Sequence, residues 1–121
     1  MPRYVDGYVI PIKKRNLAAY RRLAFKCGKV WMDHGALGFM ECAGEDLKTK
    51  FARSFTKLAK TKPGETVLFS FIVYQSRKDR DRVNAKVMKD PRLAAMMNPE
   101  AKMPFDMKRM TYGGFSTLVD L

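Results

Sequence analysis

The stretch Thr66–Tyr74, which reads TVLFSFIVY, decides the fold because it is the clearest β-strand in the chain. It is rich in β-branched and aromatic residues, and it follows a Pro63-Gly64 turn. Both of its faces are apolar: Val67, Phe69, Phe71 and Val73 share one face, and Leu68, Ile72 and Tyr74 share the other. This pattern predicts a strand that is covered on both sides.

The segments before and after this strand predict an alternation of strands and helices. Towards the N-terminus, the pattern predicts a short helix in residues 47–62, a strand in 36–43, a helix in 14–33 and a strand in 4–12. Towards the C-terminus, Ser76 to Asp79 resembles a capping box and predicts a helix to about residue 89. A short helix is predicted to begin at Asp90-Pro91, reach Met97 and stop before Pro99. The last strand, about 108–118, is predicted to bulge or to be closely approached at Gly113-Gly114.

This order predicts one ferredoxin-like α+β domain over residues 1–121, with a β-α-β-β-α-β chain path and a four-stranded antiparallel sheet. We expect the first strand to lie between the second and the third, and the last strand to flank the third. Both main helices should cover the same face, so the other face would be left bare. A large exposed apolar patch is unusual in a monomer, and we therefore predict a homodimer that packs sheet against sheet.

Composition limits the classes of protein that need to be considered. The chain has 121 residues, a formal net charge of +12 and 46% hydrophobic residues. No apolar stretch approaches the roughly 20 residues that span a bilayer, and no secretory signal is recognisable, so we expect no membrane partner. Two cysteines, Cys27 and Cys42, are too few for a disulfide framework, and a reduced cytoplasmic location is expected. Much of the basic excess falls on the predicted solvent side of the helix at 14–33, which leaves open whether a polyanion binds.

Four side chains are candidates for acid–base chemistry. His34 is the only histidine, but its position in the last turn of a predicted helix favours a structural or surface role. Asp6 and Glu41 are acids within predicted strands, where an unpaired buried charge is costly. Arg109 is the expected partner of Asp6, with Lys108 as the alternative. Each acid is either a pocket group with a shifted pKa or part of a salt bridge that fixes the dimer.

The aromatic residues Tyr8, Trp31, Phe39 and Tyr112 are candidates for lining a ligand pocket, although the same spacing is typical of core packing. A single histidine argues against a zinc or haem site, and Gly113-Gly114 lacks the frame of a phosphate-binding loop. We therefore expect no metal and no cofactor. The catalytic residues stay open among the four candidates above, and so does the question of whether the protein is an enzyme.

Several motifs resemble those of the YbaA-like conserved hypothetical proteins, a small bacterial family. They are Tyr4-Val5-Asp6-Gly7, His34-Gly35-Ala36-Leu37, Glu41-Cys42, Asp90-Pro91-Arg92 and the closing run from Met103 to Phe115. The resemblance spans nearly the whole chain. It implies membership of the dimeric α+β barrels, in which two ferredoxin-like sheets form one barrel with the helices outside. It implies no particular activity, substrate or cofactor.

Three hypotheses for the function follow. The first is a homodimeric barrel that binds, or also transforms, a small apolar or aromatic metabolite. The second is an RNA-binding module that uses the basic surface and stacks bases on the sheet residues Tyr4, Tyr8, Phe69 and Phe71, although the third strand lacks the RNA-recognition pattern. The third is a structural or stress-related protein without chemistry.

Overall fold

The computed structural model describes residues 1–97 and 102–121. The strands are β1 (Tyr4–Lys13), β2 (Gly38–Ala43), β3 (Glu65–Tyr74) and β4 (Thr111–Ser116). The helices are α1 (Leu17–Asp33), α2 (Phe55–Ala59), α3 (Arg77–Met88) and α4 (Pro91–Met96), with 3-10 turns η1 (Lys14–Asn16) and η2 (Met107–Arg109). The predicted helix at 47–62 is thus confined to α2, and the predicted stop before Pro99 lies outside the described residues.

The strands form one antiparallel sheet in the order β2-β3-β1-β4, which is the ferredoxin-like arrangement. The predicted fold class is therefore confirmed, but the predicted neighbours of β1 are wrong. Strand β1 lies between β3 and β4, and β2 is an edge strand that pairs only with β3 within the described chain. Both β1 and β2 run antiparallel to β3, so they are parallel to each other, and α1 carries the chain across β3 between them.

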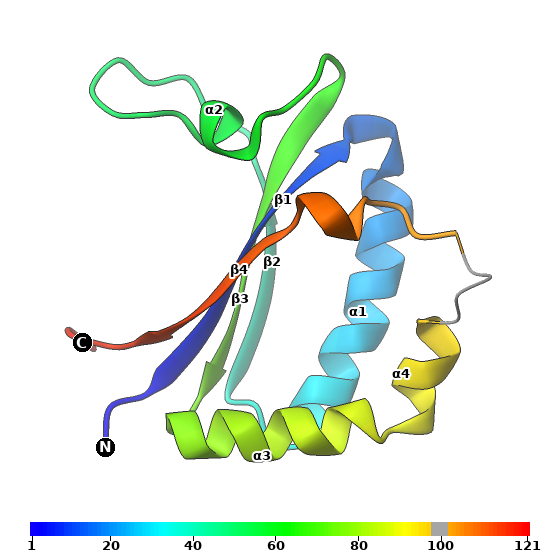
Figure 1. Cartoon of the computed structure of the whole chain (residues 1–121), viewed down its shortest axis with the longest axis vertical. Helices are drawn as coiled ribbons and strands as arrows, with labels where there is room; N and C mark the ends of the chain where they lie inside the picture. Colours follow the sequence, from blue (N-terminus) through cyan, green and yellow to red (C-terminus); the bar gives the residue numbers. More distant parts are fainter. Residues whose placement is uncertain (98–101) are drawn as a thin grey trace.

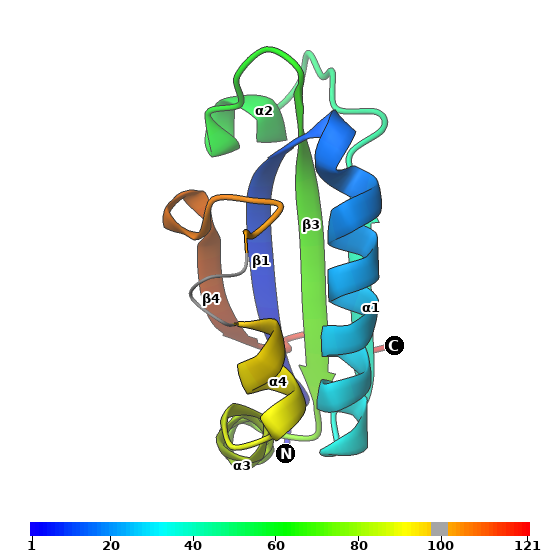
Figure 2. The same ribbon diagram turned by 90° about the vertical axis from the view of Figure 1, so that its right-hand side faces the viewer.

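Helices α1, α3 and α4 lie on one face of the sheet, as Figures 1 and 2 show. Two apolar clusters fill the space between: one joins Val30, Ile72, Tyr74, Val83 and Val87, and the other joins Ile10, Ile12, Tyr20, Ala24 and Leu68. The alternation of β3 therefore places Leu68, Ile72 and Tyr74 against the helices.

The opposite face, which we call the open sheet face, is formed by Val5, Val9, Met40, Phe69, Phe71, Val73 and Phe115. The sequence predicted that this face would be bare, but α2 covers one end of it (Figure 1). The rings of Phe55 and Phe69 pack edge-on there, with 5.9 Å between their centroids. Beyond α2, Met40 and Phe115 remain 53% and 61% exposed. A substantial apolar surface is therefore left uncovered.

Side-chain caps explain where α3 and α4 begin. Ser76 Oγ accepts a hydrogen bond from the Asp79 backbone N–H at 3.1 Å. Asp90 Oδ1 accepts one from the Arg92 N–H at 2.8 Å, and Pro91 occupies the first turn of α4. Both starts agree with the sequence pattern, because each cap satisfies an N–H that has no partner within its helix.

Strand β4 runs without a bulge through Gly113 and Gly114, which pair in register with Gly7 and Asp6. The predicted bulge is therefore wrong, and the alternative of a close approach is correct. A Cβ at position 114 would lie 2.8 Å from Cε2 of Tyr4 and closer still to its hydroxyl oxygen. A Cβ at position 113 would meet only ordinary contacts, at 3.6 Å from Phe115.

We expect Gly114→Ala to lower the free energy of unfolding by about 1–3 kcal/mol, because the Tyr4 ring must move out of its packed position. Gly113→Ala, at the neighbouring residue of the same strand, is the matched control and should have a clearly smaller effect. Urea denaturation of both variants measures the difference. Equal destabilisation would show that glycine is needed at 114 for a reason other than Tyr4.

Candidate functional site

A groove of about 650 Å³ lies between α1 and the edge strand β2. The α1 wall includes Leu17, Tyr20, Arg21, Ala24, Phe25, Gly28, Lys29, Met32 and Asp33, and the sheet contributes Phe39, Glu41, Cys42, Ala43 and Leu68. Most of these side chains are apolar. A volume of this size falls within the range of small-molecule sites.

The inward face of β2 places one carboxyl group in this apolar groove. Register with β3 sets Phe39 opposite Ile72, Glu41 opposite Ser70 and Ala43 opposite Leu68, so Glu41 shares the helix-covered face with buried residues. The alternation of a strand therefore brings an ionisable residue to a position that apolar neighbours surround.

Two hydroxyl groups hold one oxygen of Glu41. Tyr20 donates to Oε1 at 2.8 Å, and Ser70 Oγ donates to the same atom through a short contact. No described residue donates to the second oxygen, Oε2, and no described cation forms an ion pair with Glu41. The carboxyl group is thus oriented by α1 and β3, and one oxygen remains for a ligand.

Burial raises the pKa of Glu41 above its ordinary value of 4.5, although the hydrogen bonds from Ser70 and Tyr20 oppose this shift. Burial, followed by the charge of Glu41, also raises the pKa of Tyr20, which keeps its hydroxyl protonated and donating. The groove therefore holds a carboxyl group that can donate through Oε2 when protonated and accept when ionised.

The raised pKa of Glu41 predicts a pH dependence of stability. The folded state binds this proton more tightly than the unfolded state, so the contribution of Glu41 is fully present below 4.5 and is lost as the pH rises through the higher folded pKa. We expect the free energy of unfolding of Glu41→Gln, relative to the native protein, to increase as the pH rises above 4.5. Urea denaturation at several pH values tests this, and a difference that does not vary with pH would contradict the buried position of the carboxyl group.

The second predicted acid, Asp6, belongs to a different cluster. It is fully buried, and Arg80 of α3 donates to Asp6 Oδ1 at 2.7 Å and to the Tyr112 hydroxyl at 2.8 Å through the same nitrogen, Nη1. Arg80 also lies over the Tyr4 ring at 4.9 Å, and the rings of Tyr8 and Tyr112 are 5.0 Å apart. This arrangement is an ion pair that fastens α3 to β1 and β4.

The predicted partnership of Asp6 and Arg109 is wrong. Arg109 precedes β4 and forms hydrogen bonds with both oxygens of Glu65, at 2.7 and 2.9 Å. Asp6 pairs in register with Gly114 within β4, whereas Arg109 belongs to η2, before that strand begins at Thr111. The interaction with Arg109 lowers the pKa of Glu65 to about 2.

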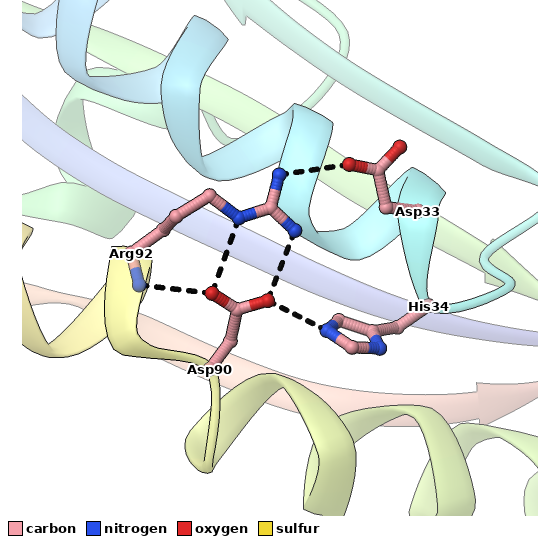
Figure 3. A network of polar contacts seen from close by, with 4 residues as sticks. All are labelled: Asp33, His34, Asp90 and Arg92. Carbon is pink, nitrogen blue, oxygen red and sulfur yellow. Dashed lines mark hydrogen bonds and ion pairs between the residues drawn. The ribbon is translucent and has the colours of Figure 1, made fainter.

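His34 takes part in a polar network that Figure 3 shows. Its Nε2 lies 2.8 Å from Asp90 Oδ2, and Arg92 contacts both oxygens of Asp90, at 2.9 and 3.1 Å. Arg92 also donates to Asp33 at 2.8 Å. Arg92 first, and then His34, hold the pKa of Asp90 well below its usual range. The network joins the end of α1 to the start of α4.

The predicted aromatic residues are divided among several places. Phe39 lines the groove, but Trp31 packs beside it, at 6.3 Å between ring centroids, and donates to Asn84 Oδ1 at 3.0 Å. Tyr8 and Tyr112 belong to the cluster around Asp6. Of the eight predicted site residues, the groove contains only Glu41 and Phe39.

The predicted base-stacking platform is wrong as a set of four. Tyr4 and Tyr8 pack against the core on the helix-covered face, whereas Phe69 and Phe71 belong to the open sheet face. Residues of one strand alternate between faces, and the register of β1 with β3 places the tyrosines on the side opposite these phenylalanines. One surface cannot present all four rings.

Sequence reasoning missed Tyr20 and Ser70, the two donors to Glu41. Tyr20 lies on the apolar arc of the first helix. Ser70 lies between the apolar residues Leu68 and Ile72 on the same face of β3. An isolated polar residue on a buried strand face signals a partner nearby, and this signal could have found Ser70.

Within the described residues, 1–97 and 102–121, no three His, Cys, Asp or Glu side chains are grouped so that they could hold a metal ion. None of the helices described there has the length and apolar character needed to cross a bilayer.

Comparison with known proteins identifies the family. The chain is 38% identical to the uncharacterised protein YbaA of Escherichia coli K12 over 118 residues, which cover 98% of each chain, and the same values hold for YbaA of Shigella flexneri. A crystal structure described as a dimeric ferredoxin-like protein from an uncultured marine organism has a TM-score of 0.62 at 10% identity and full coverage of both chains. A nipsnap family protein of unknown function from Agrobacterium tumefaciens has a TM-score of 0.58 at 13% identity, over 96% of this chain and 88% of the other. Residues 3–107 match the model of DUF1428, a family described as proteins of unknown function, and the chain belongs to that family.

Proposed function

We propose that the protein binds a small apolar or aromatic molecule in the groove between α1 and β2, and that Glu41 forms a hydrogen bond with a polar group of that molecule. The observation that carries this proposal is that Glu41 Oε2 accepts no hydrogen bond from a described residue, although it lies in a largely apolar groove of about 650 Å³. A carboxyl group in such a setting is a typical polar anchor, because it fixes the orientation of a ligand that apolar contacts hold.

We also propose that two copies of the chain pair through the open sheet face. Met40 and Phe115, at 53% and 61% exposed, stand at opposite edges of this face, and Phe69 lies between them. An apolar surface that crosses all four strands is unusual in a monomer. The marine protein is described as dimeric, and its chain has the same fold. A second copy would cover this face and leave the groove, which lies on the helix side, accessible.

A ligand screen tests the groove. We expect molecules from a library of small apolar and aromatic compounds to raise the melting temperature of the native protein. Glu41→Gln should weaken binding of such hits by about 2- to 10-fold, the effect of one net hydrogen bond. Phe25→Ala should also weaken it, because this exposed ring lines the groove.

The matched control is Met88→Ala, which removes an exposed apolar side chain of α3 outside the groove. It should leave the affinity of each hit unchanged. Hits whose affinity responds to Met88→Ala but not to the two groove variants would place the ligand elsewhere. A library without hits, together with no co-purified molecule in native mass spectrometry, would contradict the proposed function.

A further inference from the structure

We propose that the ligand of this groove is an anionic amphiphile, with an elongated apolar body along the groove and a carboxylate or similar group paired with Arg21 and Lys29. This inference rests on the proposed function, because it names the chemical class of the molecule that the groove binds.

The groove is elongated. Its α1 residues Leu17, Arg21, Phe25, Gly28 and Met32 recur about once per turn, so the groove follows one stripe of the helix. From Leu17 to Met32 this stripe is roughly 22 Å long at the rise of an α-helix. An extended chain or a set of fused rings fits such a shape better than a single compact ring does.

Apolar side chains of the groove are left exposed. Phe25 is 64% exposed and Met32 is 44% exposed, although each lines the groove with apolar neighbours. An apolar body lying between them would remove this surface from water, and the gain increases with the area covered.

Two cations and two acids, Asp33 and Glu41, line the groove, and the pairing of Asp33 with Arg92 leaves one positive charge in excess. Arg21 and Lys29 line it, and neither forms an ion pair with a described residue. Lys29 Nζ lies 4.9 Å from the centre of the Phe25 ring, so this cation stands beside an apolar wall. The acid at the end of the groove, Asp33, is already paired with Arg92 at 2.8 Å. Two cations without a described partner, beside an apolar surface, match a molecule that is apolar with one anionic group.

The position of Glu41 favours a ligand whose anionic group lies near Arg21 and Lys29. A carboxyl group with no cation partner among the described residues repels a second anion, and the anionic group of the ligand is therefore directed away from Glu41 and towards Arg21 and Lys29. A neutral hydroxyl or carbonyl group can still meet Oε2.

The test compares two pairs of probes that differ in charge: dodecanoate with dodecanol, and 2-naphthoate with 2-naphthol. Dodecanoate is kept below its critical micelle concentration, and the other probes are kept below their solubility limits. Binding is followed by calorimetry and by the fluorescence of Trp31, the only tryptophan, whose ring lies 6.3 Å from that of Phe39 in the groove wall. We expect at least one anion to bind more tightly than its neutral partner. Added salt should lower the affinity for that anion and leave the affinity for its neutral partner unchanged.

The decisive variant is Arg21→Gln/Lys29→Gln, and the matched control is Arg22→Gln/Lys26→Gln, which removes two exposed cations of α1 that do not line the groove. The first double variant should weaken binding of the anion by about 5- to 30-fold, as expected for two exposed ion pairs, and should leave the neutral probe unchanged. The control should change neither probe by more than about 2-fold.

The outcomes separate the inference from the proposed function. Equal losses in both double variants would show a general attraction to the positively charged protein, which overturns the inference. If both neutral probes bind in the groove as tightly as their anions, the inference is overturned but the proposed function is supported. If none of the four probes binds and the compound library also yields no hit, both are overturned.

Discussion

Arg80→Met is expected to lower the free energy of unfolding by about 3–5 kcal/mol, because it leaves the charge of Asp6 buried without a partner. Asp6 is fully buried, and Arg80 is the described cation that contacts it, at 2.7 Å. A domain of this size is stable by only about 5–15 kcal/mol, so the variant would lose a large fraction of its stability. Urea denaturation followed by circular dichroism measures the loss.

Two further variants separate the ion pair from the loss of a long side chain. Asp6→Asn/Arg80→Met removes both charges and should recover much of the lost stability, because no buried charge then remains at this pair. Arg82→Met, on the same helix, breaks the half-exposed pair with Asp79 and should change the free energy of unfolding by at most about 1 kcal/mol. If Arg80→Met behaved like Arg82→Met, the pair would not be what fastens α3 to the sheet.

Met40→Glu/Phe115→Glu is expected to convert a dimer into monomers. Both side chains are more than half exposed in the single chain, so the substitutions spare the core, yet they would place charges within an apolar interface. Light scattering at about 10 μM should give twice 13.9 kDa for the native protein and 13.9 kDa for the variant.

Met88→Glu/Met107→Glu is the matched control, because it adds the same two charges at exposed methionines of α3 and η2, outside the open sheet face. It should keep the native mass. A native protein that scatters as a single chain would contradict the proposed pairing, and a mass that fell equally in both double variants would show an effect of charge alone.

The fold followed from local patterns. The alternation in Thr66–Tyr74 and the 3.6-residue spacing in α1 are properties of neighbouring residues, and they predicted the sheet, its helices and the caps at Ser76 and Asp90. The order of the strands is a property of the whole chain. The partner of Asp6 is also a property of the whole chain: Arg109 lies in η2, before β4, and the partner is Arg80 on α3.

The candidate site was predicted only in part, for the same reason. Glu41 stood out as an acid in an apolar strand, and this property is visible in the local sequence. Its donors Tyr20 and Ser70 are 21 and 29 residues away, on α1 and β3. Their meeting depends on the register of β2 with β3 and on the rotation of α1 about its axis. Neither quantity is encoded in a short stretch of sequence.

Three successive residues of β3 connect the two proposed properties. Phe69 and Phe71 belong to the open sheet face, and Ser70 between them donates to Glu41 on the other side. Only about 3.4 Å of strand separates each of these phenylalanines, on the face proposed to contact a second copy, from the serine that holds Glu41. If ligand occupancy changes the self-association constant by some factor, thermodynamic reciprocity requires self-association to change ligand affinity by the same factor. The amide resonances of residues 69–71 would therefore report on both equilibria at once.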